Sequence, residues 1–191
     1  MRKLYISEMM TIDGFFEGPN REIDWHNVDE EFIEYAVDQL DRTGVLVFGR
    51  VTYELMASYW PTELALTNDP IVAGRMNAMP KIVASRSLAK AAWNNTTLIR
   101  ENIAEEISRL KEQPGKDIGI FGSAELVATL LQSELIDEIR IFINPVILRK
   151  GNPFFHSTSE RVNLKLLRTE TFHSGNVLAC YRPVSKTGRR G

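Results

Sequence analysis

Apolar residues follow two alternating patterns along the first two thirds of the chain. Short runs rich in β-branched and aromatic residues are typical of buried strands, and apolar residues at every third or fourth position are typical of amphipathic helices. The runs predict strands over residues 4–10, 45–49, 81–85, 96–100 and 117–121. The helical spacing predicts helices over 29–42, 51–58, 70–79 and 124–132, and one more that is capped by Asn102 and ends at Pro114.

The last third of the chain is dominated by strands. The pattern predicts them over 138–144, 163–172 and 177–182, and the turn sequence 173–176 joins the last two as a hairpin. Strands that alternate with helices build parallel sheets, whereas a hairpin is antiparallel. The sequence therefore predicts an α/β fold in three layers, with a mostly parallel central sheet, an antiparallel C-terminal hairpin and helices on both faces.

Length and composition fit one domain. The chain has 191 residues, of which 43% are hydrophobic, enough for a single well-buried core. We expect this domain to span residues 1–183 and to be followed by a basic, flexible end over residues 184–191. The loop over residues 11–20 contains two glycines, a proline and two aromatic residues that we expect to be exposed.

Charge and cysteine content exclude several classes of partner. The 23 basic and 25 acidic residues are spread along the chain, so we expect neither a nucleic-acid surface nor a membrane surface. Because no run of about 18 apolar residues occurs, we expect a cytoplasmic protein. The single cysteine, Cys180, lies in an alternating apolar segment and is predicted to be a buried thiol. The three histidines show no metal-ligand spacing, and we expect no metal.

A glycine ends the strand over 45–49 and opens a helix. Gly49 is followed by Arg50 and Thr52, so a planar cation, a hydroxyl and the positive end of a helix dipole meet within four residues. This junction predicts a phosphate site, although a simple strand end with a solvated arginine has the same sequence. A second junction of strand, glycine and helix occurs at Gly122 and Ser123. Both lie where parallel strands end, the edge at which such sheets bind ligands.

Five segments together resemble the dihydrofolate reductase-like family, and most closely its branch with the reductase domain of riboflavin biosynthesis. Their order and spacing cover nearly the whole chain, and they comprise residues 10–16, 48–56, 80–86, 120–124 and 135–155. The resemblance implies the dihydrofolate reductase-like fold and a reductase that uses NADPH, bound across the carboxyl edge of the sheet. It also implies a homodimer, for which the apolar segment 139–148 could supply a strand-mediated interface.

The resemblance implies a set of cofactor contacts. Gly49, Arg50 and Thr52 correspond to residues on the cofactor phosphates, and Ser85 with Arg86 to residues that recognise the adenosine 2′-phosphate. Gly122 and Ser123 correspond to a pair of glycines that approach the cofactor closely; the serine offers a hydroxyl and can cap the following helix. Tyr53 and Glu54 can face either the cofactor or the core.

The loop after the first strand corresponds to the mobile substrate loop of the family. Asp13, Gly14 and Phe15 are therefore expected to border the nicotinamide, and Trp25 either stacks on a heterocycle or plugs the core. The proton donor of dihydrofolate reductases corresponds to Asp29 or Glu30. Acidic residues are also common in a first helical turn because they suit the helix dipole, and the sequence favours that second interpretation.

The substrate is the part of the assignment that the sequence leaves open. Relatives in the riboflavin pathway often read Leu-Gly-x-Gly over the positions of Leu148 to Gly151, so Arg149 replaces a glycine. Arg149 and Lys150 are either ligands of a substrate phosphate or solvated charges. The leading hypothesis is an NADPH-dependent reductase of a small heterocyclic or ribosyl substrate, most like 5-amino-6-(5-phosphoribosylamino)uracil reductase. The alternatives are a dihydrofolate reductase and a non-catalytic, nucleotide-binding dimeric module.

Overall fold

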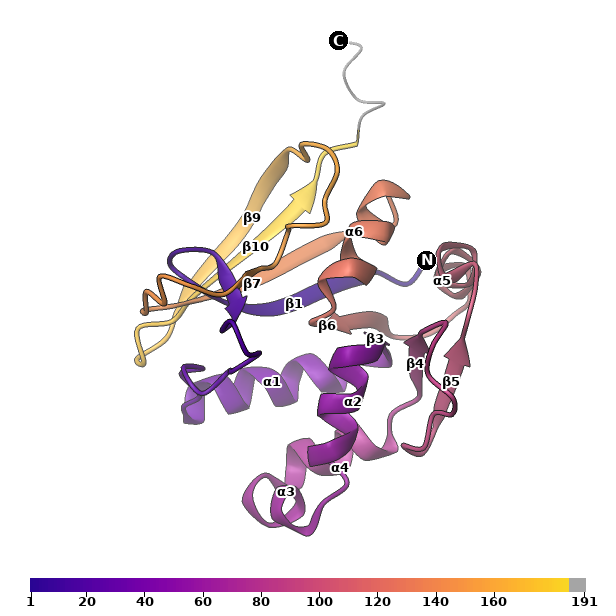
Figure 1. The fold of residues 1–191 in the computed structure, drawn as a ribbon, viewed down its shortest axis with the longest axis horizontal. Coiled ribbons are helices and arrows are strands. Elements are labelled where there is room, and N and C mark those ends of the chain that lie inside the picture. The colour runs from indigo at the N-terminus through magenta and orange to yellow at the C-terminus, as the bar shows by residue number, and fades with distance from the viewer. Residues whose placement is uncertain (186–191) are drawn as a thin grey trace.

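The computed structural model describes residues 1–185, in which eight strands form one sheet in the order β5-β4-β3-β6-β1-β7-β10-β9 (Figure 1). A separate pair of very short strands, β2 and β8, lies beside it. The strand bounds are β1 Leu4–Thr11, β2 Phe15–Glu17, β3 Thr43–Gly49, β4 Lys81–Ala84, β5 Thr96–Ile99, β6 Asp117–Phe121, β7 Glu138–Asn144, β8 Asn152–Pro153, β9 Leu164–Thr171 and β10 Val177–Pro183.

Strand directions agree with the sequence prediction. Every neighbouring pair from β5 across to β7 is parallel, and β10 is antiparallel to both β7 and β9. The parallel part requires crossover connections, which contain helices except between β4 and β5. The fold is therefore the predicted mostly parallel sheet with an antiparallel C-terminal hairpin at one edge.

Six helices cover the two faces of this sheet in the described part of the chain: α1 Glu30–Arg42, α2 Arg50–Tyr59, α3 Glu63–Asn68, α4 Pro70–Ala78, α5 Ile103–Glu112 and α6 Ala124–Gln132. Side chains of α5 and α6 pack on one face, in a cluster that includes Ile107, Leu130 and Ile6. Side chains of α1, α2 and α4 pack on the opposite face, around Phe48 and Met76. Figure 1 shows the resulting three layers.

Most predicted elements are present within one or two residues of their expected bounds, and the misses have local causes. Helix α3 and the pair β2–β8 are too short to show a periodic pattern. Asn102 stands before α5 as expected, but it is left-handed and its side chain makes no capping bond. The aromatic residues of the 11–20 loop are half-buried rather than exposed, because Phe16 packs edge-on against Phe154.

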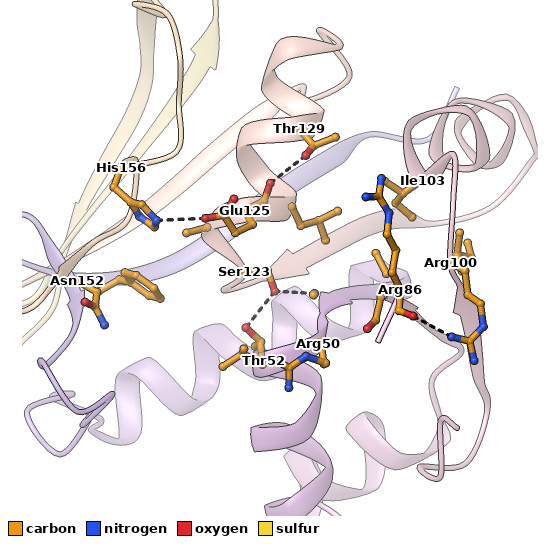
Figure 2. Close-up of a pocket in the computed structure, with 18 of the residues that line it drawn as sticks. Arg50, Thr52, Arg86, Arg100, Ile103, Ser123, Glu125, Thr129, Asn152 and His156 are labelled. Carbon is orange, nitrogen blue, oxygen red and sulfur yellow. Dashed lines mark hydrogen bonds and ion pairs between the residues drawn. The ribbon is translucent and has the colours of Figure 1, made fainter. Parts of the chain in front are cut away.

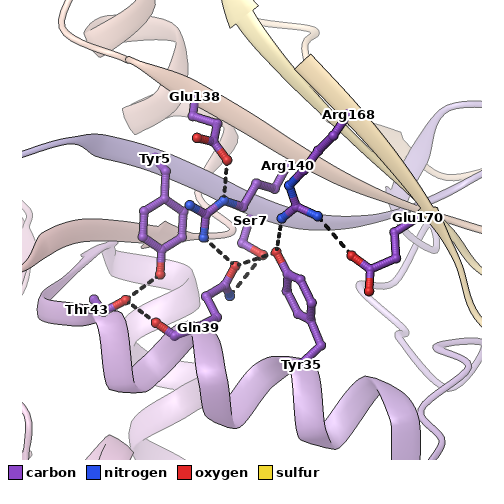
Figure 3. Close-up of polar contacts among 9 residues, drawn as sticks. All are labelled: Tyr5, Ser7, Tyr35, Gln39, Thr43, Glu138, Arg140, Arg168 and Glu170. Carbon is purple, nitrogen blue, oxygen red and sulfur yellow. Dashed lines mark hydrogen bonds and ion pairs between the residues drawn. The ribbon is translucent and has the colours of Figure 1, made fainter. Parts of the chain in front are cut away.

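Helix α1 is held to the sheet by a network of polar side chains (Figure 3). Arg140 of β7 pairs with Glu138 at 2.8 Å, donates to Gln39 of α1 at 3.0 Å and lies over the Tyr5 ring at 3.8 Å from its centroid. Because β7 pairs with β1 on one side and β10 on the other, it is an interior strand. The prediction that segment 139–148 forms a strand-mediated interface is therefore wrong for its strand part.

The C-terminal part of the described chain is ordered slightly beyond the predicted domain end. The Val184 N–H donates to the Asn163 carbonyl at 2.8 Å, and the rest of the predicted basic end, 186–191, lies outside the described residues. Cys180 is fully buried, as predicted. Within residues 1–185, no helix has the length and apolar character needed to cross a membrane.

Candidate active site

A cavity of about 750 Å³ lies at the carboxyl edge of the sheet (Figure 2). Its floor and walls come from residues that end β3, β4 and β5, from the starts of α2 and α6, and from the pair β2–β8. The polar and charged lining residues are Glu17, Arg21, Arg50, Thr52, Ser85, Arg86, Arg100, Glu101, Asn102, Ser123, Glu125, Thr129, Asn152 and His156. The sequence-predicted residues Gly49, Arg50, Thr52, Ser85, Arg86 and Ser123 are thus brought together.

The two glycine junctions touch each other across this cavity. The Gly49 N–H donates to Ser123 Oγ at 2.7 Å, and Ser123 Oγ–H donates to Thr52 Oγ1 at 3.0 Å (Figure 2). Ser123 occupies the N-cap position of α6, but its side chain makes no capping bond there. The predicted cap role is therefore wrong: the hydroxyl joins the start of α6 to the start of α2.

The close approach of the junctions requires a glycine at position 122 and leaves little room for a side chain at position 49. Gly122 has a φ of +67°, and a Cβ there would meet Thr52 Oγ1 at 2.9 Å. A Cβ on Gly49 would meet Ser123 Oγ at 3.1 Å. Gly122 itself does not line the cavity, so its role in this structure is to let the two junctions touch.

Positive charge gathers on one side of the cavity. Arg50 is paired with Glu54 at 2.8 Å, one helical turn along α2. Arg100 donates to the carbonyls of Arg86 and Ala89, which fixes the loop after β4. The Arg86 guanidinium has no ion pair among the described residues, so its charge is available to an anion.

Ser85 has a structural task in addition to its place on the cavity wall. Its Oγ accepts hydrogen bonds from the N–H groups of Ser87 at 3.2 Å and Leu88 at 2.9 Å. These bonds turn the chain immediately after β4 and direct Arg86 toward the cavity. Tyr53 faces the core, where its hydroxyl accepts from the Trp93 N–H, whereas Glu54 faces outward to Arg50.

Sequence reasoning missed several polar residues of the cavity. Arg100 comes directly after β5, and Arg86 comes two residues after β4. An arginine close behind a strand is therefore a sequence signal that applies to both residues. Glu125 and His156 were also missed; they pair at 3.2 Å across the cavity wall. His156 follows β8, a strand too short to recognise, and its sequence carries no signal for this position.

The predicted substrate loop lies outside the cavity except at its end. The Asp13 carboxylate accepts from the N–H groups of Leu148 and Arg149, and hydrogen bonds from Thr11 and then from Arg149 lower its pKa. Gly14 has a φ of +87° and forms the turn before β2. Asp13, Gly14 and Phe15 thus tie two loops together, and Phe16 and Glu17 are the residues that reach the cavity.

Trp25 packs against the core beside α1 and does not line the cavity. It contacts the cluster around Phe142 and Leu178, and its indole N–H donates to the Glu22 carbonyl at 3.2 Å. Its ring meets His26 edge-on at 4.5 Å between centroids. Burial lowers the pKa of His26 to about 4, so this imidazole is neutral at pH 7. The core interpretation of Trp25 is the one that the structure supports.

Asp29 and Glu30 do not line the cavity either. Asp29 is the N-cap of α1: one oxygen accepts from the Phe32 N–H at 2.8 Å, and the other from the Ser174 N–H at 3.2 Å. The Phe32 bond, followed by those from Ser174, lowers the pKa of Asp29. A carboxylate stabilised in this way is a poor proton donor. Glu30 is exposed in the first turn, so both residues take the helix-dipole role that the sequence favours.

The donor set of the cavity fits a phosphate-rich dinucleotide better than a metal. Helix α2 directs its first N–H groups toward the space in which Arg21, Arg50, Arg86 and Arg100 gather. Within residues 1–185, no three His, Cys, Asp or Glu side chains are grouped as metal ligands.

Comparisons with known proteins agree with this architecture. The chain is 34% identical over 180 residues to the uncharacterized protein YyaP of Bacillus subtilis (strain 168), covering 94% of each chain. A protein from Shewanella sp. PV-4 that is named for riboflavin biosynthesis superposes with a TM-score of 0.73 at 20% identity, covering 97% of this chain and all of the other.

A third match is a bifunctional protein from Thermotoga maritima, a diaminohydroxyphosphoribosylaminopyrimidine deaminase and 5-amino-6-(5-phosphoribosylamino)uracil reductase. It superposes with a TM-score of 0.67 at 14% identity, covering 96% of this chain and 57% of that one. At such identities the two structures establish the fold. The family model of the RibD C-terminal domain matches residues 2–178. The chain therefore belongs to the RibD C-terminal domain family.

Proposed function

We propose that the protein is an NADPH-dependent reductase that transfers a hydride to a small heterocyclic or ribosyl substrate. The substrate class we propose is the one in the name of the Thermotoga relative, a 5-amino-6-(5-phosphoribosylamino)uracil. The observation that supports this most directly is the cavity at the carboxyl edge, where two glycine junctions and several arginines converge. Family membership supports the reaction class.

The residues on the cavity wall suit the parts of NADPH. The first N–H groups of α2, together with Arg50 and Thr52, would hold the central phosphates. Arg86 and Arg100, which follow β4 and β5 on the same cavity, would hold the 2′-phosphate that distinguishes NADPH from NADH. When bound, NADPH supplies the hydride.

The chain itself contributes position and shape. Ser123 fixes the spacing between the starts of α2 and α6, so the phosphate-binding groups are in place before a ligand arrives. Arg100 holds the Arg86 carbonyl and thereby orients the loop that recognises the 2′-phosphate. Apolar lining residues such as Ile99, Ile103 and Leu126 exclude water from the remaining wall.

Cofactor binding tests this proposal. We expect purified protein to enhance NADPH fluorescence with saturation, and Arg86→Gln and Arg100→Gln each to weaken NADPH binding about 10-fold to 100-fold with little change for NADH, as expected when a charge-assisted phosphate contact is lost. Arg109→Gln is the matched control, because Arg109 pairs with exposed glutamates on α5. Absence of binding at millimolar NADPH would overturn the proposal.

Substrate identity is tested separately by NADPH oxidation. We expect oxidation with 5-amino-6-(5-phosphoribosylamino)uracil and none with 7,8-dihydrofolate. The N-cap role of Asp29 argues against the dihydrofolate alternative, since that residue would be its acid. Oxidation with dihydrofolate would reverse the assignment, and binding without turnover of either compound would favour the non-catalytic module.

We further propose that the protein is a homodimer and that strand β9 is its contact edge. All eight residues of β9 are exposed, including Leu164, Leu166 and Leu167, and the strand has a single neighbour in the sheet. An exposed apolar edge strand is an assembly site in many proteins. Light scattering after size-exclusion chromatography should give about twice the 21.7 kDa chain mass, and Leu166→Lys should halve it. A monomeric wild-type protein would overturn this proposal.

A further inference from the structure

Strand β1 carries Glu8 directly after the point where its pairing with β6 ends. Strand β6 pairs with β1 only as far as Ser7, opposite Phe121, whereas β7 continues to pair with β1 up to Thr11. From Glu8 onward, β1 has therefore lost its partner on the β6 side. The chain leaves β6 toward α6 on one face and leaves β1 toward α1 on the other, which is the arrangement at which parallel sheets form ligand crevices.

The Glu8 side chain is half-buried, and its carboxyl end lies beside apolar residues. It lies on the same side of β1 as Ile6 and Met10, which pack in the cluster with Phe16 and Phe154. Its Oε1 accepts from the Met9 N–H at 3.0 Å, and its Oε2 is buried without a hydrogen-bond partner in the described structure. A protonated carboxyl suits this environment, because an ionised one would need donors for both oxygens. Burial raises the pKa of Glu8 to about 8.

A second carboxyl, that of Glu17, lies on the cavity wall. Glu17 belongs to β2, which packs against β1, and it lines the cavity. Its Oε1 accepts from Asn152 Nδ2 of β8 at 2.6 Å, so its position is fixed by the β2–β8 pair. The charge of Glu17 raises the pKa of Glu8 further, after burial and against the Met9 bond.

Other charged groups near this end of the sheet are engaged elsewhere. Glu125 and His156 pair with each other on the cavity wall. On β7, Glu138 and Arg140 pair on the α1 side of the sheet (Figure 3). Arg140 is the register partner of Ser7, so Glu8, the next residue of β1, lies on the opposite side. Burial is the main cause of the raised pKa of Glu8, and Glu17 is the charge that raises this pKa further.

We propose that Glu8 and Glu17 form the proton-donating pair of this site, with Glu17 as the catalytic acid on the cavity wall and Glu8 as the positioning residue that stores the proton behind it. The proposal rests on the proposed reductase function. A hydride reduction of a C=N or C=O bond also needs one proton on the heteroatom. Glu8 passes its proton to the Glu17 carboxylate, and Glu17 passes it to the substrate nitrogen or oxygen.

The step balances. The substrate would gain one proton from the pair and the hydride that bound NADPH would supply by two-electron oxidation, and the pair would be left one proton short until water restored it after product release. The pair would also supply the proton donor that the resemblance to dihydrofolate reductases places at Asp29 or Glu30, neither of which lines the cavity. A relay of this kind suits a substrate whose reduced atom carries an adjacent basic nitrogen or oxygen.

Carbon-13 NMR of protein labelled at the glutamate carboxyl carbon tests the proton store without cofactor or substrate. We expect one glutamate signal to titrate near pH 8, to vanish in Glu8→Gln and to titrate at lower pH in Glu17→Gln. Glu125→Gln, which removes a carboxylate of the same wall, should leave that titration in place. Glutamine replaces a neutral carboxyl with similar shape, so we expect the Glu8→Gln variant to fold, and its unfolding midpoint checks this. A Glu8 signal that titrates near pH 4–5, or that ignores Glu17→Gln, would overturn the proposal.

NADPH oxidation with 5-amino-6-(5-phosphoribosylamino)uracil tests the relay. Loss of a general acid typically lowers the rate about 100-fold or more, so we expect Glu17→Gln to lower kcat by about that factor with little change in NADPH affinity. Glu8→Gln should lower kcat at least tenfold at pH 7.5, and the loss should shrink toward pH 5.5. Variants with wild-type kcat at both pH values would overturn the relay. Failure of the wild-type protein to bind NADPH would instead overturn the proposed function, and the titration alone would then decide whether the pair holds a proton.

Discussion

The two halves of the carboxyl edge of the sheet are built in different ways. The half over β3 to β6 consists of short junctions in which the cavity residues follow the end of a strand within one to three positions, as Arg50 follows Gly49 and Ser85 follows Ala84. The half over β1 and β7 is held by contacts between distant segments, such as the Asn27 N–H to Asn144 Oδ1 at 2.8 Å and Asp13 to Arg149. The first half is therefore encoded locally, and the second depends on the completed fold.

The largest effect is expected from breaking the junction half at Gly122. Valine at this position would have to adopt a φ of +67° and would push its Cβ against Thr52 Oγ1. We expect Gly122→Val to lower the free energy of unfolding by about 3 kcal/mol and to abolish NADPH binding. Urea denaturation measures the first effect. The matched control is Gly74→Ala, a helical position with open space around it, which should be neutral or slightly stabilising. Equal stability of Gly122→Val and wild type would show that the junctions do not need this contact.

A smaller effect is expected from breaking the long-range half at Asn144. This buried side chain accepts from the Asn27 N–H and donates to the Phe142 carbonyl, and alanine leaves both groups unpaired. We expect Asn144→Ala to lower the free energy of unfolding by about 2 kcal/mol, with NADPH affinity unchanged within twofold. Asn163→Ala, at an exposed position, is the control. A large loss of NADPH affinity in Asn144→Ala would mean that the two halves are coupled rather than separate.

The smallest effect is expected at Asp29, and it depends on pH. The pKa of Asp29 is lower in the folded than in the unfolded chain, so its stabilisation is present above the unfolded value of about 3.9 and is lost as the pH falls through the folded value. Asp29→Ala should therefore lower the urea midpoint at pH 7, and the difference from wild type should narrow below about pH 4. Reductase activity should persist. Loss of activity with an unchanged midpoint would restore Asp29 as the acid.

The same contrast explains which residues of the site could be predicted from the sequence. Gly49, Ser85 and Ser123 were predictable because a strand end and a helix start are visible in the local pattern, and Arg100 was within reach of the same rule. The roles of the carboxylates could not be predicted from the sequence. From the sequence, Asp29 fits both the role of a proton donor and the role of a helix cap, and the hydrogen bond from Ser174 that favours the cap is visible only in the fold. The strands β2 and β8 are too short to show a periodic pattern.

Glu8 is an intermediate case. A charged residue inside the apolar strand Leu4–Thr11 is a break in the pattern that the sequence displays openly. Its significance depends on where β6 ends, on the position of Glu17 and on the missing partner of Oε2, all of which are tertiary facts. A charged residue within an apolar strand is thus a candidate site residue that the sequence alone can identify, although its chemical role can be inferred only from the fold.

The position of β1 in the sheet has a consequence for how the chain folds. Its strand neighbours are β6 and β7, so Leu4 pairs with Ile118 and Tyr5 with Glu138, whereas β3, β4 and β5 pair among themselves. Synthesis at about 5–20 residues per second leaves the apolar β1 without its neighbours for several seconds or longer. The first strand made is among the last to be enclosed, and a fragment that stops before β6 would expose both of its edges to aggregation.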